Sequence, residues 1–363
     1  MTGGDILSTG LASWTRPGRG TMMQAARRPW QTPRPDELKD AELDIIADIA
    51  ALYYADQVTQ EELSHKFGMS RAKVGRLLKR AREEGIVEIM VRPHPGVAAK
   101  IEQEFIQRFG IERLIVAVDH RDQDTQRVAL ASLVAAYLNR QLRDGMIVAV
   151  GMGRNIGAVA DGLVLPNQRA VTFVSAIGGS LRAGEFMNPD HICRRLAARF
   201  GGESETLYAP ALVDNPESRL ALMQNETVRQ TLDRARRADI ALIGVGDLSE
   251  DSNMVRMGWF TPKEVTEARL SGTIGDMMGY DFFDIQGRPS SLGMQGRIIG
   301  LTTPELRRIP NVIAVASENT KAAGILGALR TNTINTLATS LSNAHTLLSL
   351  DDATRLQRPT ALN

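Results

Sequence analysis

The chain has 363 residues, of which 43% are hydrophobic and 23% charged, the balance of a globular protein with two or three domains. No apolar run approaches the ~18 residues that a membrane span requires, so we expect no membrane partner. The single cysteine, Cys193, excludes disulfides within the chain and favours a reducing cytoplasm. Scattered histidines show no metal-ligand spacing, and we expect neither a metal nor a cofactor. The net charge of +1 hides an uneven distribution, because residues 64–82 contain seven Lys or Arg and no acid.

The N-terminal segment changes character near residue 39. Residues 1–38 carry Gly, Pro and Arg without periodicity, which predicts a disordered tail. From about Asp40 apolar residues recur at helical spacing. A second helix is expected to open at Thr59, because Glu62 three residues later completes a capping box.

A third helix follows after a short turn. Gly68 lies in that turn, and Ser70 is the expected N-cap of a helix that runs to Glu84 and stops at Gly85. Residues 86–91 alternate and are rich in β-formers, which predicts a wing strand. The spacing is that of a winged helix-turn-helix.

The third helix has one apolar and one basic side. Small residues, Ala72 and Gly75, lie on the basic side, where a DNA backbone can approach closely. A basic helix is often only a solvated face, but the spacing, the two caps and the missing acids together favour DNA binding. The candidate DNA contacts are Thr59, Gln60, Ser70, Arg71, Lys73, Arg76 and Lys79.

Beyond a hinge at Pro93 and Pro95, an amphipathic helix leads into alternating segments. Strand-like and helical stretches then follow one another, which predicts an α/β domain with a largely parallel sheet. The expected strands are 114–118, 146–150, 171–176, 240–245 and 312–316, with helices over 125–142 and from 156.

Residues 70–87 resemble the recognition helix and wing entry of SorC-type (DeoR-like) sugar-responsive transcriptional regulators, and the resemblance extends over about residues 40–350. The family's effector domain is similar to the sugar-phosphate isomerase and deaminase fold. Its landmarks occur here in order as 151–155, 177–179, 208–210, 244–247, 275–276 with 283–284, and 317–324.

Residues 151–155 follow a strand and open a helix, a position where backbone N–H groups can converge on an anion. We expect effector contacts from Gly151, Gly153, Arg154 and Asn155. Dinucleotide binding is the alternative, but the third glycine, Gly157, comes one residue late, and no acid ends the next strand. Relatives often carry Thr in this loop, so a bisphosphate effector is disfavoured, while a monophosphate or an unphosphorylated polyol stays open.

The resemblance assigns further effector residues. Lys321 is expected to point into the sugar site and pair with phosphate. Asp276 matches an acidic position that hydrogen-bonds sugar hydroxyls, a task that suits a carboxylate. Gly178, Gly179 and Asp247 complete the expected site.

We therefore expect a DNA-binding regulator of a carbohydrate or polyol operon, and by resemblance a repressor. Its partners would be operator DNA and a sugar, sugar phosphate or polyol, and the protein would be a homodimer or homotetramer. The alternative is a sugar-phosphate isomerase or deaminase, but no histidine lies close in sequence to Gly151 or Asp276. The expected domains are a tail (1–38), a winged helix-turn-helix (39–94), a linker helix (95–112), an effector domain (113–352) and a C-terminal tail (353–363).

Overall fold

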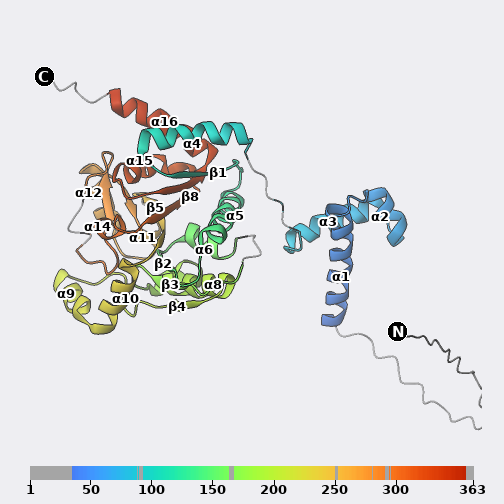
Figure 1. Ribbon diagram of the computed structural model, residues 1–363, viewed down its shortest axis with the longest axis horizontal. Coiled ribbons are helices and arrows are strands. Elements are labelled where there is room, and N and C mark those ends of the chain that lie inside the picture. The colour runs from blue at the N-terminus through green and yellow to red at the C-terminus, as the bar shows by residue number, and fades with distance from the viewer. Residues whose placement is uncertain are drawn as a thin grey trace, which may run out of the picture. The chain divides into compact units, whose positions relative to one another are not determined.

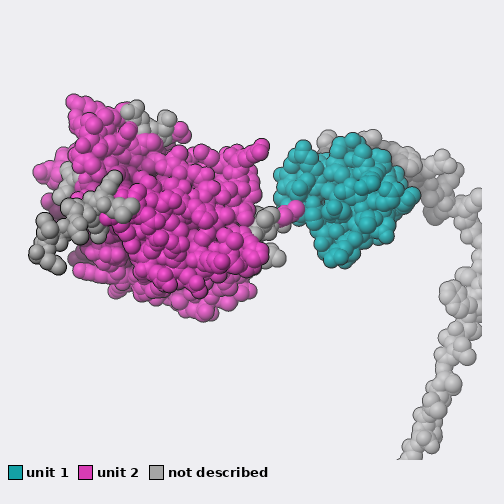
Figure 2. Space-filling model, turned by 90° about the horizontal axis from the view of Figure 1, so that it is seen from above, with its two compact units in different colours: residues 1–88 teal, residues 89–363 magenta. Residues whose placement is uncertain are grey.

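The computed structural model describes residues 35–87, 89, 93–162, 167–249, 252–279, 281–290, 294 and 296–356, without side chains for 35–41 (Figure 1). The chain divides into two compact units, residues 1–88 and 89–363 (Figure 2). Most of the expected N-terminal tail and the last seven residues, 357–363, lie outside the described residues. Each unit is described by itself.

The N-terminal unit contains three helices, α1 (Pro35–Tyr54), α2 (Gln60–Phe67) and α3 (Arg71–Glu83). The predicted caps are confirmed: the Thr59 hydroxyl accepts from the Glu62 N–H within a capping box, and Ser70 caps α3. The helices enclose a small core of buried side chains, Ile46, Ile49, Leu63, Val74, Leu77, Leu78 and Ala81. Of the predicted wing strand, residues 86–91, half (88, 90 and 91) lies outside the described residues, and the structure assigns no strand at 86, 87 or 89.

The larger unit is built on a sheet whose order is β1-β9-β8-β5-β2-β3-β4, with every neighbouring pair parallel. The predicted α/β class with a largely parallel sheet is therefore confirmed. Two further strands, β6 and β7, extend β5 in antiparallel fashion. The strands are β1 (Arg113–Ala117), β2 (Ile147–Val150), β3 (Thr172–Ser175), β4 (Glu203–Glu205), β5 (Ile240–Asp247), β6 (Thr273–Met277), β7 (Asp281–Asp284), β8 (Asn311–Ala316) and β9 (Thr336–Ser340).

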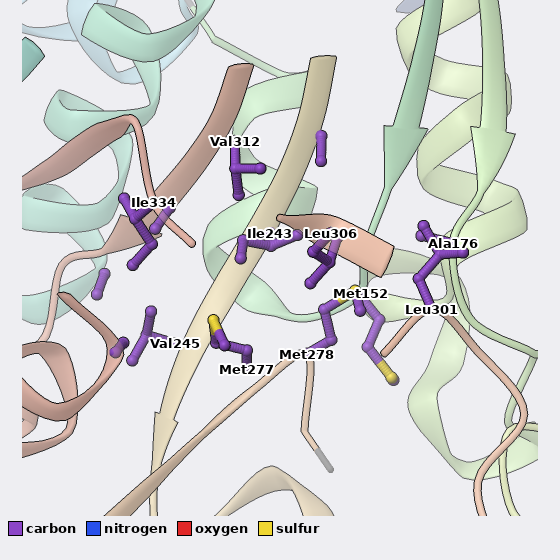
Figure 3. Close-up of a cluster of buried hydrophobic side chains, with 14 of the residues drawn as sticks. Met152, Ala176, Ile243, Val245, Met277, Met278, Leu301, Leu306, Val312 and Ile334 are labelled. Atoms are coloured by element: carbon purple, nitrogen blue, oxygen red, sulfur yellow. The ribbon is translucent and has the colours of Figure 1, made fainter. Parts of the chain in front are cut away.

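The central strands β2, β5 and β8 are buried on both faces, which explains their nearly continuous apolar sequences. Successive residues of β8 point to opposite faces, so Val312 belongs to one hydrophobic cluster and Ile313 to the other. Figure 3 shows part of the first cluster, in which Met152, Met278 and Ile243 pack with residues from several strands.

Helices cover both faces of the sheet (Figure 1). Helix α4 (Pro95–Phe109), expected as a linker, packs on the sheet unit, where Phe105 is fully buried, and its Arg108 pairs with Asp352 of α16. The other helices are α5 (Gln123–Gln141), α6 (Arg154–Ala160), α7 (Gly184–Met187), α8 (Pro189–Phe200), α9 (Pro216–Gln224), α10 (Glu226–Arg236), α11 (Asn253–Arg256), α12 (Pro262–Leu270), α14 (Thr303–Leu306), α15 (Ala322–Arg330) and α16 (Leu341–Leu356). Among the helices in the described ranges, none is both long and apolar enough to cross a membrane.

Candidate functional sites

A cavity lies at the carboxyl edge of the sheet, where the loops after β2, β5 and β8 meet. From β2 the chain continues to β3 on one side, whereas from β5 it passes through β6 and β7 and returns to the parallel sheet at β8 on the other side. The strand order thus reverses between β2 and β5. Such a reversal separates two neighbouring loops and leaves a crevice, the usual ligand site of open α/β sheets.

The cavity has a volume of about 400 Å³, within the range of small-molecule sites. Its wall combines charged side chains with five methionines, Met152, Met187, Met254, Met257 and Met278. Six of the nine expected effector residues line it, namely Gly153, Arg154, Asn155, Asp247, Asp276 and Lys321. The structure therefore brings residues from four separate segments of the sequence into one site.

Lys321 does not stand alone in this cavity. Its Nζ lies 3.0 Å from Oε2 of Glu318, and the exposed fractions of the two side chains are only 13% and 5%. Arg154 lies on the other carboxylate oxygen, with 3.6 Å between its guanidinium and Oε1 of Glu318. Glu318 thus holds both cations that the sequence assigns to the effector.

Glu318 is fixed from a third direction by Asn155. The Asn155 amide donates to Oε2 of Glu318 at 2.9 Å and accepts from the Ser317 hydroxyl at 2.6 Å. Burial alone would raise the pKa of Glu318, but the Lys321 charge and the hydrogen bonds from Asn155 and Lys321 outweigh it and hold that pKa to about 2. The carboxylate is therefore ionised at any physiological pH.

Asp276 faces the same cavity from β6 and is 1% exposed. Its Oδ1 accepts from the Gly279 N–H at 2.6 Å, while Oδ2 is buried and has no hydrogen-bond partner among the described residues. Burial raises the pKa of Asp276 to about 7, against the opposing Gly279 hydrogen bond and Lys321 charge. Gly246 provides the space for Oδ2, since a Cβ at that position would lie 2.1 Å from it.

The loop at 151–155 makes internal contacts that its sequence does not reveal. The Gly151 N–H donates to the carbonyl of Leu242 at 2.8 Å, and the Gly153 N–H to the carbonyl of Met187 at 3.2 Å. These two amides are therefore already used within the fold. Gly151 itself does not line the cavity.

Gly178 and Gly179 lie elsewhere. Gly179 lines a second, more open cavity of about 550 Å³, and Met257 is shared by both cavities. Gly178 lines neither of them. A Cβ on Gly178 would lie 2.6 Å from the carbonyl oxygens of Ala209 and Pro210, so a close backbone approach explains this glycine.

Helix α3 presents the basic side that the sequence predicts. Lys73, Arg76 and Lys79 are exposed, while Val74 and Leu78 are buried on the opposite side. Lys79 pairs loosely with Glu83 at 3.4 Å, and Arg71 lies 4.0 Å from Glu61. Within the described part of the chain Lys73 and Arg76 have no ion-pair partner.

The three remaining candidate DNA contacts lie at the starts of the two helices. Thr59 and Ser70 use their hydroxyls as caps, and Gln60 is the first residue of α2. The Gln60 side chain reaches toward α3, because a Cβ on Gly75 would lie 3.7 Å from its Oε1.

Sequence reasoning missed Glu318, although the segment that contains it was one of the landmarks. The one signal in the sequence was the spacing of Glu318 and Lys321, three residues apart with opposite charges. The five methionines of the cavity wall could not be predicted from a local sequence pattern, because they come from separate segments of the chain.

A parallel sheet with a polar cavity at its switch point, following a separate three-helix unit, defines a two-part protein with a small-molecule-binding α/β domain. Residues 94–349 match the family model "Putative sugar-binding domain". The chain is 30% identical to the sorbitol operon regulator of Klebsiella pneumoniae over 312 residues, covering 85% of this chain and 98% of the relative.

Two solved structures are similar. The sugar-binding domain of a transcriptional repressor from Vibrio fischeri is 49% identical, covers 70% of this chain and 99% of its own, and has a TM-score of 0.66. The full-length sorbitol operon regulator SorC from Klebsiella pneumoniae is 29% identical, covers 84% and 98% of the two chains, and has a TM-score of 0.67. The chain belongs to the SorC-type family of sugar-binding transcriptional regulators.

Proposed function

We propose that this protein is a transcriptional regulator of a carbohydrate or polyol operon, and that a sugar-class effector in the 400 Å³ cavity controls its binding to operator DNA. The observation that carries the proposal is Asp276, which lines a polar cavity at the switch point of the sheet and whose buried Oδ2 has no hydrogen-bond partner among the described residues. A buried acceptor without a partner is costly, and a ligand hydroxyl supplies the missing hydrogen bond.

The N-terminal unit is the DNA-binding part, a winged helix-turn-helix in which α3 enters the major groove. Its support is the capped α2–α3 pair and the unpaired cations of Lys73 and Arg76. Arg and Lys on such a helix contact phosphates or guanine. The same interface includes the remaining candidates, which are Arg71, Lys79, Thr59, Gln60 and Ser70.

The protein acts as a homodimer or homotetramer, because helices of this kind read two half-sites that mirror a two-fold axis. Light scattering on the free chain and on the DNA complex tests this assembly. A monomer in both would contradict it.

An isomerase or deaminase is the second candidate, and Asp276 is the observation in its favour. A buried carboxyl with a pKa of about 7 has the properties of a general base. However, the described lining of the cavity contains no histidine, and the relatives named above are regulators. Incubation with pentose and hexose phosphates, followed by product analysis, separates the two, since a regulator releases its ligand unchanged.

The proposed function is tested with the full chain and the DNA that precedes its own transcription unit. We expect footprinting to reveal an inverted repeat, and sugars or polyols to change the affinity for it. A chain that binds this DNA no better than unrelated DNA, at matched salt, would contradict the regulator proposal.

A further inference from the structure

We propose that the effector is an uncharged polyhydroxylated compound, an unphosphorylated sugar or sugar alcohol, and that the cavity selects against its phosphate esters. This inference rests on the proposed function and names the ligand class of the same site. It reverses the expected role of Lys321 as a phosphate ligand.

The first step is that two of the three cations in the cavity wall, Lys321 and Arg154, already pair with Glu318. Lys321 lies 3.0 Å and Arg154 3.6 Å from the two carboxylate oxygens of Glu318. A phosphate that recruited Lys321 would take it away from the carboxylate of Glu318, whose side chain is 5% exposed. Removing one partner of a buried ion pair is strongly unfavourable, because an uncompensated charge stays behind.

Glu318 is held in place by further hydrogen bonds, and its carboxylate is not easily protonated. Its Oε2 also accepts from the Asn155 amide, which is anchored in turn by the Ser317 hydroxyl. Because these contacts and Lys321 lower the pKa of Glu318, protonation does not relieve the site at neutral pH. The carboxylate is a permanent negative charge in the wall of the cavity.

Second, the charged side chains around the cavity are balanced in number. Three cations face three carboxyl groups: Arg154, Arg256 and Lys321 against Asp247, Asp276 and Glu318. A phosphate monoester would add a charge of about −1.5 to −2 at neutral pH. Even with Asp276 protonated, the wall would have a surplus of only one positive charge. An uncharged ligand leaves the balance intact.

Third, two backbone amides of the loop at 151–155 already donate hydrogen bonds within the fold. The N–H groups of Gly151 and Gly153 donate to the carbonyls of Leu242 and Met187, so neither can bind a phosphate without breaking a hydrogen bond of the fold. Helix α6, which the loop opens, has only seven residues. The amides of Gly151 and Gly153 therefore serve the packing of the fold.

The fourth step is positive evidence for hydroxyl groups. Oδ2 of Asp276 is fully buried and lacks a partner within the described ranges. Asp247, the last residue of β5, lines the same cavity and lies close enough to Asp276 to raise its pKa. A carboxyl group can accept hydrogen bonds from neighbouring hydroxyls of one polyol. The methionine wall supplies adaptable apolar surface for the C–H groups of such a ligand.

The test uses the full chain and matched pairs of compounds: glucose, fructose, sorbitol, ribitol and erythritol, each beside its terminal phosphate monoester. Thermal shift identifies binders and calorimetry measures them. We expect at least one parent compound to bind and its phosphate ester to bind roughly 10-fold more weakly or worse, the factor for one lost charged hydrogen bond. Inorganic phosphate should not displace the parent.

A pair of matched variants tests the site itself. Asp276→Asn should weaken binding of the parent by roughly 10- to 100-fold. Asp214→Asn makes the same chemical change at an exposed position outside the cavity and should leave binding unchanged. Equal affinity in Asp276→Asn and the unmodified chain, with melting temperatures that confirm folding, would overturn the proposal.

The outcomes distinguish a failure of the proposed ligand class from a failure of the proposed regulator function. A phosphate ester that binds more tightly than its parent would overturn this inference and leave the proposed regulator intact. If no compound of either series changed the melting temperature or the DNA affinity, the proposed sugar-controlled function itself would fail.

Discussion

The ammonium of Lys321 lies 3.0 Å from the carboxylate of Glu318, and both side chains are nearly buried at the rim of the sheet. The two residues are only three positions apart, in the segment that links β8 to α15. The family resemblance predicts that Lys321 binds the ligand, but in the structure this lysine pairs with a carboxylate of the protein itself. Its disruption should therefore be visible in stability before any effector is added.

We expect Lys321→Met to lower the free energy of unfolding by about 3–5 kcal/mol, because Glu318 would keep its charge without its nearest cation. The double variant Glu318→Gln with Lys321→Met removes both charges and should recover much of that loss. Urea unfolding of the unmodified chain, the two single variants Lys321→Met and Glu318→Gln, and the double variant measures the coupling. If the double variant lost as much stability as the sum of two single variants, the pair would not be coupled.

Asp276 should give the stability of the chain a specific pH dependence. Its pKa, about 7 in the folded state, lies above the ordinary value of 3.8, because burial penalises the charge while Lys321 opposes the shift and Asp247 and Asp281 add to it. The folded chain thus keeps this proton where the unfolded chain has lost it. The contribution of Asp276 is complete below pH 3.8 and is lost as the pH rises through about 7.

The measurement is the stability of the unmodified chain minus that of Asp276→Asn, which cancels the other titrating groups. We expect this difference to fall between about pH 4 and about pH 7 and then level off. A difference that is constant over this range would mean that Asp276 titrates with an ordinary pKa.

The helix ends of the N-terminal unit could be predicted because their signals are local. Each helix start is determined by contacts within one turn, made by Thr59 and Glu62 for α2 and by Ser70 for α3. The structure contains both caps. The central strands could also be predicted, since β2, β5 and β8 are buried on both faces and have apolar runs.

Other features depend on contacts between distant segments. Strand β9 (Thr336–Ser340) is polar in sequence but buried between β1 and β8, so its burial overrides the pattern. The partner of Asn155 is Glu318, 163 positions away, which no local spacing indicates. Residue types at the site were therefore predictable, while their pairing was not.

Arg76→Ala and Lys79→Ala should each weaken operator binding without unfolding the N-terminal unit, since both side chains are exposed on α3. If the contact is to phosphate, affinity falls on all sequences and the salt slope drops by about one; if it is to a base, sequence preference relaxes. Lys263→Ala, which removes an 84% exposed cation of α12, is the matched control. Gel shifts that are unchanged in both α3 variants would exclude this helix as the reading surface.

Gly75→Ala separates the stability of α3 from its proposed role on DNA. The added Cβ meets only Oε1 of Gln60, at an ordinary contact distance of 3.7 Å, so the fold has room for it. Glycine in a helix interior costs about 1 kcal/mol relative to alanine, and the variant should gain about that much stability against urea. We expect its operator affinity to fall, because the methyl group would stand on the side of α3 that we propose to face the DNA. A gain in stability with a loss in affinity rules out misfolding as the cause, since the two effects have opposite signs. A more stable variant with undiminished affinity would show that Gly75 does not face the DNA.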